Sequence, residues 1–162
     1  MHPRYWLLGL VALGIGHQAP AQTLRLCTGS PGKTYHAVGE KLAELLPAMA
    51  GGELQVEVLA TGGSIDNLNK LTAGECDGAI VQGDAAEFFT TEINPGAAGS
   101  FRMLTPLYQE LSLLLCSRES GIDEIDELLD EEGASVAAGA MGSGSLATWL
   151  TFRAIKPEYE QV

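Results

Sequence analysis

The chain has 162 residues, with 9 Lys and Arg against 21 Asp and Glu and a formal net charge of −12. This length fits one ordinary domain or one lobe of a larger protein. The acidity argues against nucleic-acid binding and against docking on anionic lipid, because both need clustered Lys and Arg. Hydrophobic residues make up 46% of the chain, which is enough for a buried core and excludes a wholly disordered protein.

The N-terminus predicts a targeting segment. Arg4 precedes an uninterrupted apolar run at residues 5–16, and Ala19-Pro20-Ala21 offers the small residues that signal peptidase accepts. The run is shorter than the ~20 residues that a membrane-spanning helix needs. We therefore expect residues 1–21 to be a cleavable signal peptide and the protein to be periplasmic. An uncleaved N-terminal anchor is the alternative.

The first half of the remaining chain alternates strands with helices. Hydrophobic patterns predict strands at residues 24–28, 54–60 and 78–82. They also predict a helix at residues 35–49, a second helix that Ser64 caps and Gly74 ends, and a third helix with Asp84 and Glu87 at capping-box spacing. Such alternation predicts an α/β fold with a mostly parallel sheet covered by helices.

The second half begins with a loop at residues 94–100 and continues the same alternation. We expect strands at residues 103–107, 111–116 and 135–138, with Tyr108-Gln109-Glu110 crossing between two lobes. Residues 120–129 read as an amphipathic helix whose solvated face carries much of an acidic run, residues 119–132. A last helix should follow residues 139–145 and carry Leu146, Trp149 and Leu150.

The three cysteines do not predict a disulfide framework. Cys27, Cys76 and Cys116 each lie beside or within an apolar stretch, and an odd count leaves at least one thiol unpaired. An oxidising compartment permits a disulfide, but three small buried hydrophobic residues are the preferred interpretation.

Four of the predicted strands end in polar or Gly/Ser-rich turns that open a helix. These turns are residues 28–34, 61–64, 82–84 and 139–145. Ligands of open α/β sheets bind beyond the carboxyl ends of the strands, where helix N-termini present free N–H groups to carboxylates or phosphates. Four turns in the same structural position therefore predict a site for a small anion.

Catalytic, cofactor and metal motifs are missing from the sequence. Gly32-Lys33-Thr34 imitates the end of a phosphate-binding P-loop, but Cys27 stands where the first glycine is required. Ser143 lacks the flanking glycines of a nucleophile elbow. Beyond the expected signal peptide, His36 is the single histidine. We therefore expect no enzyme, no cofactor and no metal site.

The ordered loops carry a resemblance to a known family. The run TGGS-x-x-N-L…AGE-x-D…VQ-x-D at residues 61–84, with residues 24–47 before it and the SGIDEIDELL and AAGAMGSGSLAT segments after it, resembles the TAXI group of solute-binding proteins. The resemblance implies a type II periplasmic binding-protein fold, with two α/β lobes that close on a small anionic ligand. It also implies membrane permease subunits of a TRAP transporter as partners. Family ligands include glutamate-like amino acids and dicarboxylates.

Matching the family's loops position by position implies a ligand-binding set. It consists of Gly29, Gly32, Tyr35, Thr61, Gly62, Gly63, Ser64, Asn67, Gln82, Asp84, Gly142, Ser143, Gly144 and Ser145. By analogy Ser64, Gln82 and the backbone of residues 142–145 hold ligand oxygens. Helix capping or turn bonding is as good an account of Asn67 and Asp84, and Lys33 is expected to be solvent-exposed.

Two departures from the family pattern matter. Ala140-Met141 replaces the proline-containing start of the second-lobe loop, and family members are much longer. We therefore expect a first lobe at residues 22–107, then a crossover and the incomplete beginning of a second lobe at residues 108–162. A substrate-binding component of a TRAP-type transporter is the leading hypothesis. An exported sensor or interaction module on the same scaffold is the alternative, and an enzyme ranks third.

Overall fold

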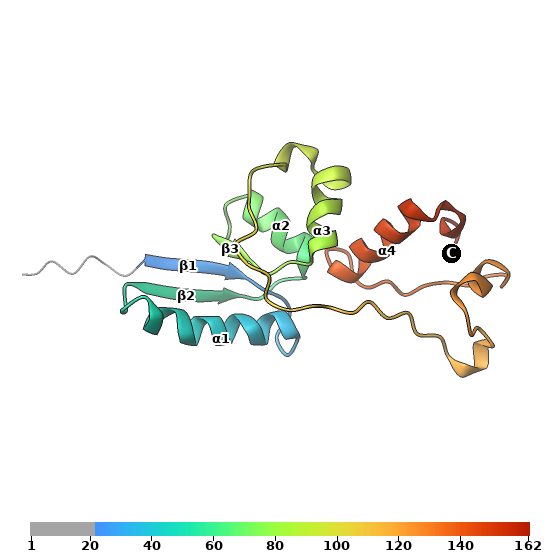
Figure 1. Cartoon of the computed structure of the whole chain (residues 1–162), viewed down its shortest axis with the longest axis horizontal. Coiled ribbons are helices and arrows are strands. Elements are labelled where there is room, and N and C mark those ends of the chain that lie inside the picture. The colour runs from blue at the N-terminus through green and yellow to red at the C-terminus, as the bar shows by residue number, and fades with distance from the viewer. Residues whose placement is uncertain (1–21) are drawn as a thin grey trace, which may run out of the picture.

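The computed structural model describes residues 22–162, so the predicted signal peptide lies outside the described residues (Figure 1). Strands β1 (Gln22–Cys27), β2 (Leu54–Leu59) and β3 (Gly78–Ala79) form a parallel sheet in the order β2-β1-β3. Side chains along β2 alternate between half-buried and exposed, as the period of two in the sequence predicts. The predicted parallel sheet is therefore confirmed, although β3 is shorter than residues 78–82.

Helices join the strands and cover both faces of the sheet. The first, α1 (Thr34–Met49), runs along β1 and β2, whereas α2 (Ser64–Thr72) and α3 (Gly83–Phe88) lie on the opposite side (Figure 1). Gly39 lets α1 approach closely, because a side chain there would collide with Thr28. After α3 the chain continues through a π-helical turn, Phe89–Ile93.

The core lies between α2 and the segment that follows α3. Leu68, Phe89 and Ala97 are buried together, and Phe101 packs against them. A 3-10 turn, Pro95–Ala97, interrupts the region predicted to be a plain loop. This cluster fixes α2 and α3 relative to each other, and with them the turns at their N-termini.

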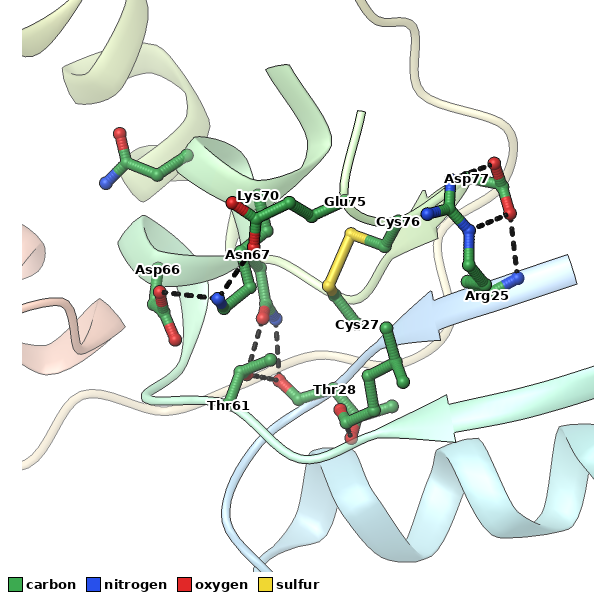
Figure 2. Close-up of a disulfide and its surroundings, with 12 residues drawn as sticks. Arg25, Cys27, Thr28, Thr61, Asp66, Asn67, Lys70, Glu75, Cys76 and Asp77 are labelled. Atoms are coloured by element: carbon green, nitrogen blue, oxygen red, sulfur yellow. Dashed lines mark hydrogen bonds and ion pairs between the residues drawn. A yellow bond between two sulfur atoms is a disulfide. The ribbon is translucent and has the colours of Figure 1, made fainter. Parts of the chain in front are cut away.

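The preferred interpretation of the cysteines, three small buried hydrophobic residues, is wrong, and the disulfide that an oxidising compartment permits is formed. Cys27 and Cys76 form a disulfide with a Cα–Cα distance of 5.9 Å (Figure 2). Cys116 is free and exposed. The pairing follows from the topology, because β1 pairs with β3 and this brings the turn before β3 against the end of β1. The disulfide is buried, since Cys27 and Cys76 are almost wholly inaccessible to solvent.

The strands predicted in the second half do not form. Residues 103–107, 111–116 and 135–138 have no hydrogen-bonded strand neighbour within residues 22–162, and the first two segments are exposed throughout. In Figure 1 this part of the chain leaves the sheet as an extended trace and returns to α4 (Gly144–Ile155). A hydrophobic pattern alone does not form a strand, because an extended segment without a neighbouring strand leaves its backbone N–H and C=O groups unpaired.

The predicted helix at residues 120–129 is also wrong. Two short 3-10 helices, Arg118–Ser120 and Ile125–Leu129, replace it, with Gly121 left-handed at φ 71° between them. Acidic residues four apart, such as Asp123 and Glu127, would repel each other along an α-helix. The Glu127 carboxylate instead accepts the N–H groups of Asp123 and Glu124, and these bonds lower its pKa.

The N-terminal caps of α2 and α3 also differ from those predicted. Gly63, with φ 116°, is the N-cap residue of α2, so Ser64 is the first helical residue and not the cap. In α3 the N-cap is Gln82, and no Asp84–Glu87 capping box forms. Within residues 22–162, no helix is long and apolar enough to cross a membrane.

Candidate functional site

The predicted loops meet at the carboxyl edge of the sheet. Asn67, which is completely buried on α2, connects the ends of all three strands (Figure 2). Its side-chain amide donates to the backbone carbonyls of Thr28 and Ile80, at 2.6 and 2.7 Å, and its oxygen accepts from the Thr61 hydroxyl at 2.5 Å. Because each polar atom of the Asn67 amide has a protein partner, its observed role is to hold the loops in register.

Ser64 is the second buried polar residue at this edge. Its Oγ accepts the backbone N–H of Gln82 at 3.1 Å and lies 3.4 Å from the Tyr35 hydroxyl. Ser64 thus ties the first turn of α2 to the turn that opens α3 and to the first turn of α1. Three of the four predicted loops converge on this one hydroxyl.

The fourth loop, residues 142–145, docks directly on α2. The carbonyl oxygen of Gly142 accepts the N–H groups of Ile65 and Asp66, at 2.9 and 3.2 Å. These are orphan donors of a helix N-terminus, where partial positive charge favours an oxygen acceptor. Gly63 suits this turn because its φ of 116° is one that other residues rarely adopt, and an added Cβ would only touch the backbone of residues 142–144 at van der Waals distance.

Gln82 and Asp84 reach from α3 to the same loop and to the helix that it opens. The Gln82 side chain lies over Gly144, where a Cβ would overlap its Oε1. Asp84 accepts a hydrogen bond from the Thr148 hydroxyl of α4 at 2.5 Å and one from the backbone of Ala85. Ser143 caps α4 by accepting the N–H of Leu146. Asp84 therefore joins the two halves of the chain, and it also bonds its own helix.

A carboxylate from the crossing segment lies beside Ser64. The Tyr35 hydroxyl donates to Glu110 Oε2 at 3.0 Å, and the Tyr108 ring packs edge-on against Tyr35 with 6.5 Å between ring centres. Burial and the nearby Glu110 charge raise the pKa of both phenols, that of Tyr108 to about 12. Both hydroxyls therefore stay protonated at neutral pH and remain hydrogen-bond donors.

The first glycine-rich loop contributes unevenly. Gly29 contacts Tyr35, and its carbonyl accepts the Thr61 N–H at 3.4 Å, so it belongs to the assembled edge. Gly32 has φ 79° and no neighbour that a Cβ would meet. Lys33 is exposed, as expected.

The remaining predicted residues lie in the other loops. Gly62 is exposed and bonds Asp66, and Ser145 follows Gly144 on α4.

An open groove of about 630 Å³ adjoins the assembled loops. Its walls come from α2, α3 and its π-turn, the Gly142 turn and α4, and include Ile65, Asp66, Phe88, Glu92, Met141 and Leu150. The groove touches Gly62 and Gly142 but has two carboxylates and no basic side chain in its lining. These two carboxylates disfavour an anion, whereas Ile65 and Asp66 in the same lining carry the N–H groups that bond the Gly142 carbonyl. The Tyr35–Ser64 side of the loops likewise carries a carboxylate, Glu110. No cluster of three or more metal-ligating side chains occurs within residues 22–162.

Sequence reasoning missed two participants. Glu110 was expected only in the crossing between lobes, and Thr148 was expected only within a helix. A polar Tyr-Gln-Glu triplet between two apolar stretches was an available signal for the first. Thr148 lies one turn after the Gly/Ser loop, and nothing in the sequence indicates its partner.

The comparison with protein families agrees with this architecture. A model described as the NMT1-like family matches residues 26–160, which include all four loops, α1 to α4, β2, β3 and the end of β1. This is a periplasmic-binding-protein-like family, and its members are typically substrate-binding proteins of transporters. Since the match covers most of the chain, the protein belongs to the NMT1-like family.

Proposed function

We propose that this protein is the periplasmic substrate-binding component of a TRAP-type transporter, of the TAXI group. In this role it is not an enzyme: it binds a small carboxylate, such as a glutamate-like amino acid or a dicarboxylate, and delivers it to membrane permease subunits. The family match supports the general role, and the TGGS…VQGD run supports the particular group.

The proposed arrangement has two lobes of the type II kind, at residues 22–107 and 108–162, with the crossing at Tyr108–Glu110. Contacts between the halves support it, since the Gly142 loop rests on α2 and Asp84 bonds Thr148. Export by a signal peptide at residues 1–21 is supported by the Cys27–Cys76 disulfide, because such bonds persist in oxidising compartments such as the periplasm.

One observation carries the proposed carboxylate specificity. Two N–H groups of the first turn of α2, those of Ile65 and Asp66, point at a single oxygen, the Gly142 carbonyl. A ligand carboxylate that replaces this carbonyl gains two charge-assisted hydrogen bonds and the positive end of the helix dipole. The Tyr35 hydroxyl, which already bonds the Glu110 carboxylate 3.0 Å away, adds a third donor beside Ser64.

A movement between the lobes follows when a ligand carboxylate replaces the Gly142 carbonyl. The Gly142 loop leaves α2 when the carboxylate enters, and closes again over the bound ligand through the free N–H groups at the start of α4. A ligand that contacts both loops stabilises the closed arrangement by its differential affinity for it. This is how a permease could distinguish the loaded protein from the empty one.

Calorimetry with glutamate, glutarate and succinate tests the proposal. The wild-type protein should bind at least one of them, and Ser64→Ala should weaken binding because it removes the hydroxyl that accepts the Gln82 N–H and lies against the Tyr35 hydroxyl. Thr72→Ala is the matched control, since Thr72 is at the far end of α2 and its hydroxyl bonds only backbone carbonyls. Absence of binding to any small carboxylate by correctly folded protein would refute the proposal.

A further inference from the structure

His36, which the proposed function does not use, joins the start of α1 to the sheet. Its Nδ1 lies 3.3 Å from the hydroxyl oxygen of Thr28, the residue that follows β1, and its side chain is only 17% exposed. Thr28 is completely buried, and its hydroxyl donates to the Leu59 carbonyl of β2 at 2.9 Å. The ring of His36 therefore lies where α1, β1 and β2 meet.

The hydrogen bonds of Thr28 decide which nitrogen of His36 carries the proton. A hydroxyl has one hydrogen and a carbonyl has none, so the short contact with Leu59 uses the hydrogen of Thr28. The Thr28 oxygen is then an acceptor toward His36, and Nδ1 must be the donor. Neutral His36 is therefore the Nδ1–H tautomer, with a lone pair on Nε2.

The contact with Thr28 persists when His36 becomes charged. The second proton binds Nε2, which lies 3.7 Å from a carboxylate oxygen of Glu40, one turn along α1. From the sheet, Thr28 brings no charge to the ring, and Glu57 of β2 lies on the opposite face, because its neighbour Val58 faces α1. The Nδ1–H donor is thus present in both charge states of the ring.

The first turn of α1 lacks another polar anchor at its start. Lys33, its N-cap residue, makes no side-chain capping bond. Tyr35 belongs to the same turn and precedes His36, and its hydroxyl lies 3.4 Å from Ser64 Oγ. A shift of this turn would therefore move the Tyr35 hydroxyl relative to Ser64.

We propose that His36, as the Nδ1–H tautomer, is a positioning residue of the candidate site. Its bond to Thr28 holds the first turn of α1 on the sheet and so places the Tyr35 hydroxyl beside Ser64. The effect of His36 on ligand affinity rests on the proposed function, whereas its tautomer and its coupling to Thr28 do not.

NMR of the ring nitrogens, with isotope-labelled histidine, tests the tautomer. In neutral His36 the proton should be on Nδ1, and on titration the Nε2 signal should change while Nδ1 stays protonated. The full chain has two further histidines, both before residue 22, and the spectrum of His36→Asn assigns the signals of His36. A neutral ring with its proton on Nε2 would overturn the proposal.

Two substitutions imitate different nitrogens of the ring. The side-chain nitrogen of Asn lies near the position of Nδ1, and that of Gln lies near Nε2. In calorimetry with glutamate, glutarate and succinate, His36→Gln should raise the Kd of the bound carboxylate about three- to tenfold, as expected for one net hydrogen bond. His36→Asn should restore most of this loss. Glu40→Gln is the control, because it removes the ion pair of the ring and leaves the bond to Thr28, and it should keep the wild-type Kd.

Thr28→Val removes the acceptor and completes a double-mutant cycle. In the Thr28→Val protein, His36→Gln should have no further effect on the Kd or on the urea midpoint. If folded wild-type protein binds none of the three carboxylates, the proposed function fails, and the NMR and urea measurements still decide the role of His36. An unchanged Kd in His36→Gln, no recovery in His36→Asn, or additive effects of His36→Gln and Thr28→Val would overturn the proposal.

Discussion

The side-chain amide of Gln82 occupies the space beside Gly144 where a Cβ would lie. The turn that opens α3, in the first half of the chain, is therefore in direct contact with the loop at residues 142–145, in the second half. This contact depends on the absence of a side chain at residue 144, and Ser64 Oγ closes the remaining space 2.8 Å from the position of a Cβ. The close contact between the two halves, and not the backbone conformation, therefore requires glycine at residue 144, because its φ is not positive.

Gly144→Ala should push Gln82 aside and separate the loops. We expect a loss of about 1–3 kcal/mol in the free energy of unfolding, as for other overpacked sites, and weaker ligand binding. Urea denaturation and calorimetry measure both. Gly83→Ala is the matched control, because Gly83 is likewise the first residue of a helix and has nothing within 4 Å of an added Cβ. Equal effects of the two substitutions would contradict the Gln82 contact.

Asn67→Ala should be among the most destabilising substitutions at the site. It leaves the carbonyls of Thr28 and Ile80 without their donor in a buried position, which costs about 2–4 kcal/mol for the two groups. Asn69→Ala, on the exposed face of the same helix, should change the free energy of unfolding by less than ~0.5 kcal/mol. Chemical denaturation of both variants decides the matter, and a small effect of Asn67→Ala would refute the structural role.

Reduction of Cys27–Cys76 should destabilise the first half of the chain. The bond joins residues 49 positions apart, and loop closure of this length accounts for about 4 kcal/mol in the chain-entropy model. Cys27→Ala with Cys76→Ala should lower the free energy of unfolding by about 2–4 kcal/mol and abolish its dependence on reductant. Cys116→Ser should do neither, because Cys116 is exposed and unpaired within the described residues.

Asp77 predicts a specific response to acid. Its hydrogen bonds and ion pair with Arg25, 2.8 Å away, lower its pKa from 3.8 to about 2. A depressed folded-state pKa contributes stability that is full above the unfolded-state value and is lost as the pH falls through the folded-state value. The free energy of unfolding should therefore fall between about pH 4 and pH 2, and less steeply in Asp77→Asn.

A charge-matched control separates this pair from the general effect of acid. Asp130→Asn removes one negative charge from the exposed acidic run. In this variant the free energy of unfolding, followed by circular dichroism, should fall as steeply between about pH 4 and pH 2 as in the wild type. If Asp77→Asn and Asp130→Asn behave alike, the Arg25 pair makes no particular contribution.

Local patterns in the sequence were sufficient for the first half of the fold. Residues 35–49 were predicted as a helix and α1 begins one residue earlier, while the alternation along residues 54–60 matches the burial in β2. In a parallel α/β unit the strands and the crossover helix are close in sequence, so the spacing of hydrophobic residues along each element indicates which of its faces is buried. The gathering of the first three loops at one edge follows from the same topology. The fourth loop reaches this edge by docking on α2, although the strand predicted before it does not form.

The remaining errors arise where structure depends on distant partners. Residues 111–116 have a strand pattern, but no segment of residues 22–162 pairs with them. The Cys27–Cys76 bond needs the spatial order β2-β1-β3, which spacing alone does not provide. Glu110 joins Tyr35 across 75 positions of sequence, and a motif cannot reveal such a contact.

Glu110 also yields a prediction for ligand binding, because its carboxylate already occupies the Tyr35 hydroxyl that we assign to the ligand. Glu110→Gln weakens this internal acceptor, so a carboxylate ligand should bind more tightly. We expect roughly two- to fivefold, which corresponds to about 0.5–1 kcal/mol for an exposed charge-assisted bond. Glu119→Gln removes the same charge without touching Tyr35, and so corrects for reduced repulsion of the anion. Tighter binding should appear in Glu110→Gln alone, because only that variant releases the Tyr35 donor; an equal gain in both would mean that net charge, and not competition for Tyr35, sets the affinity.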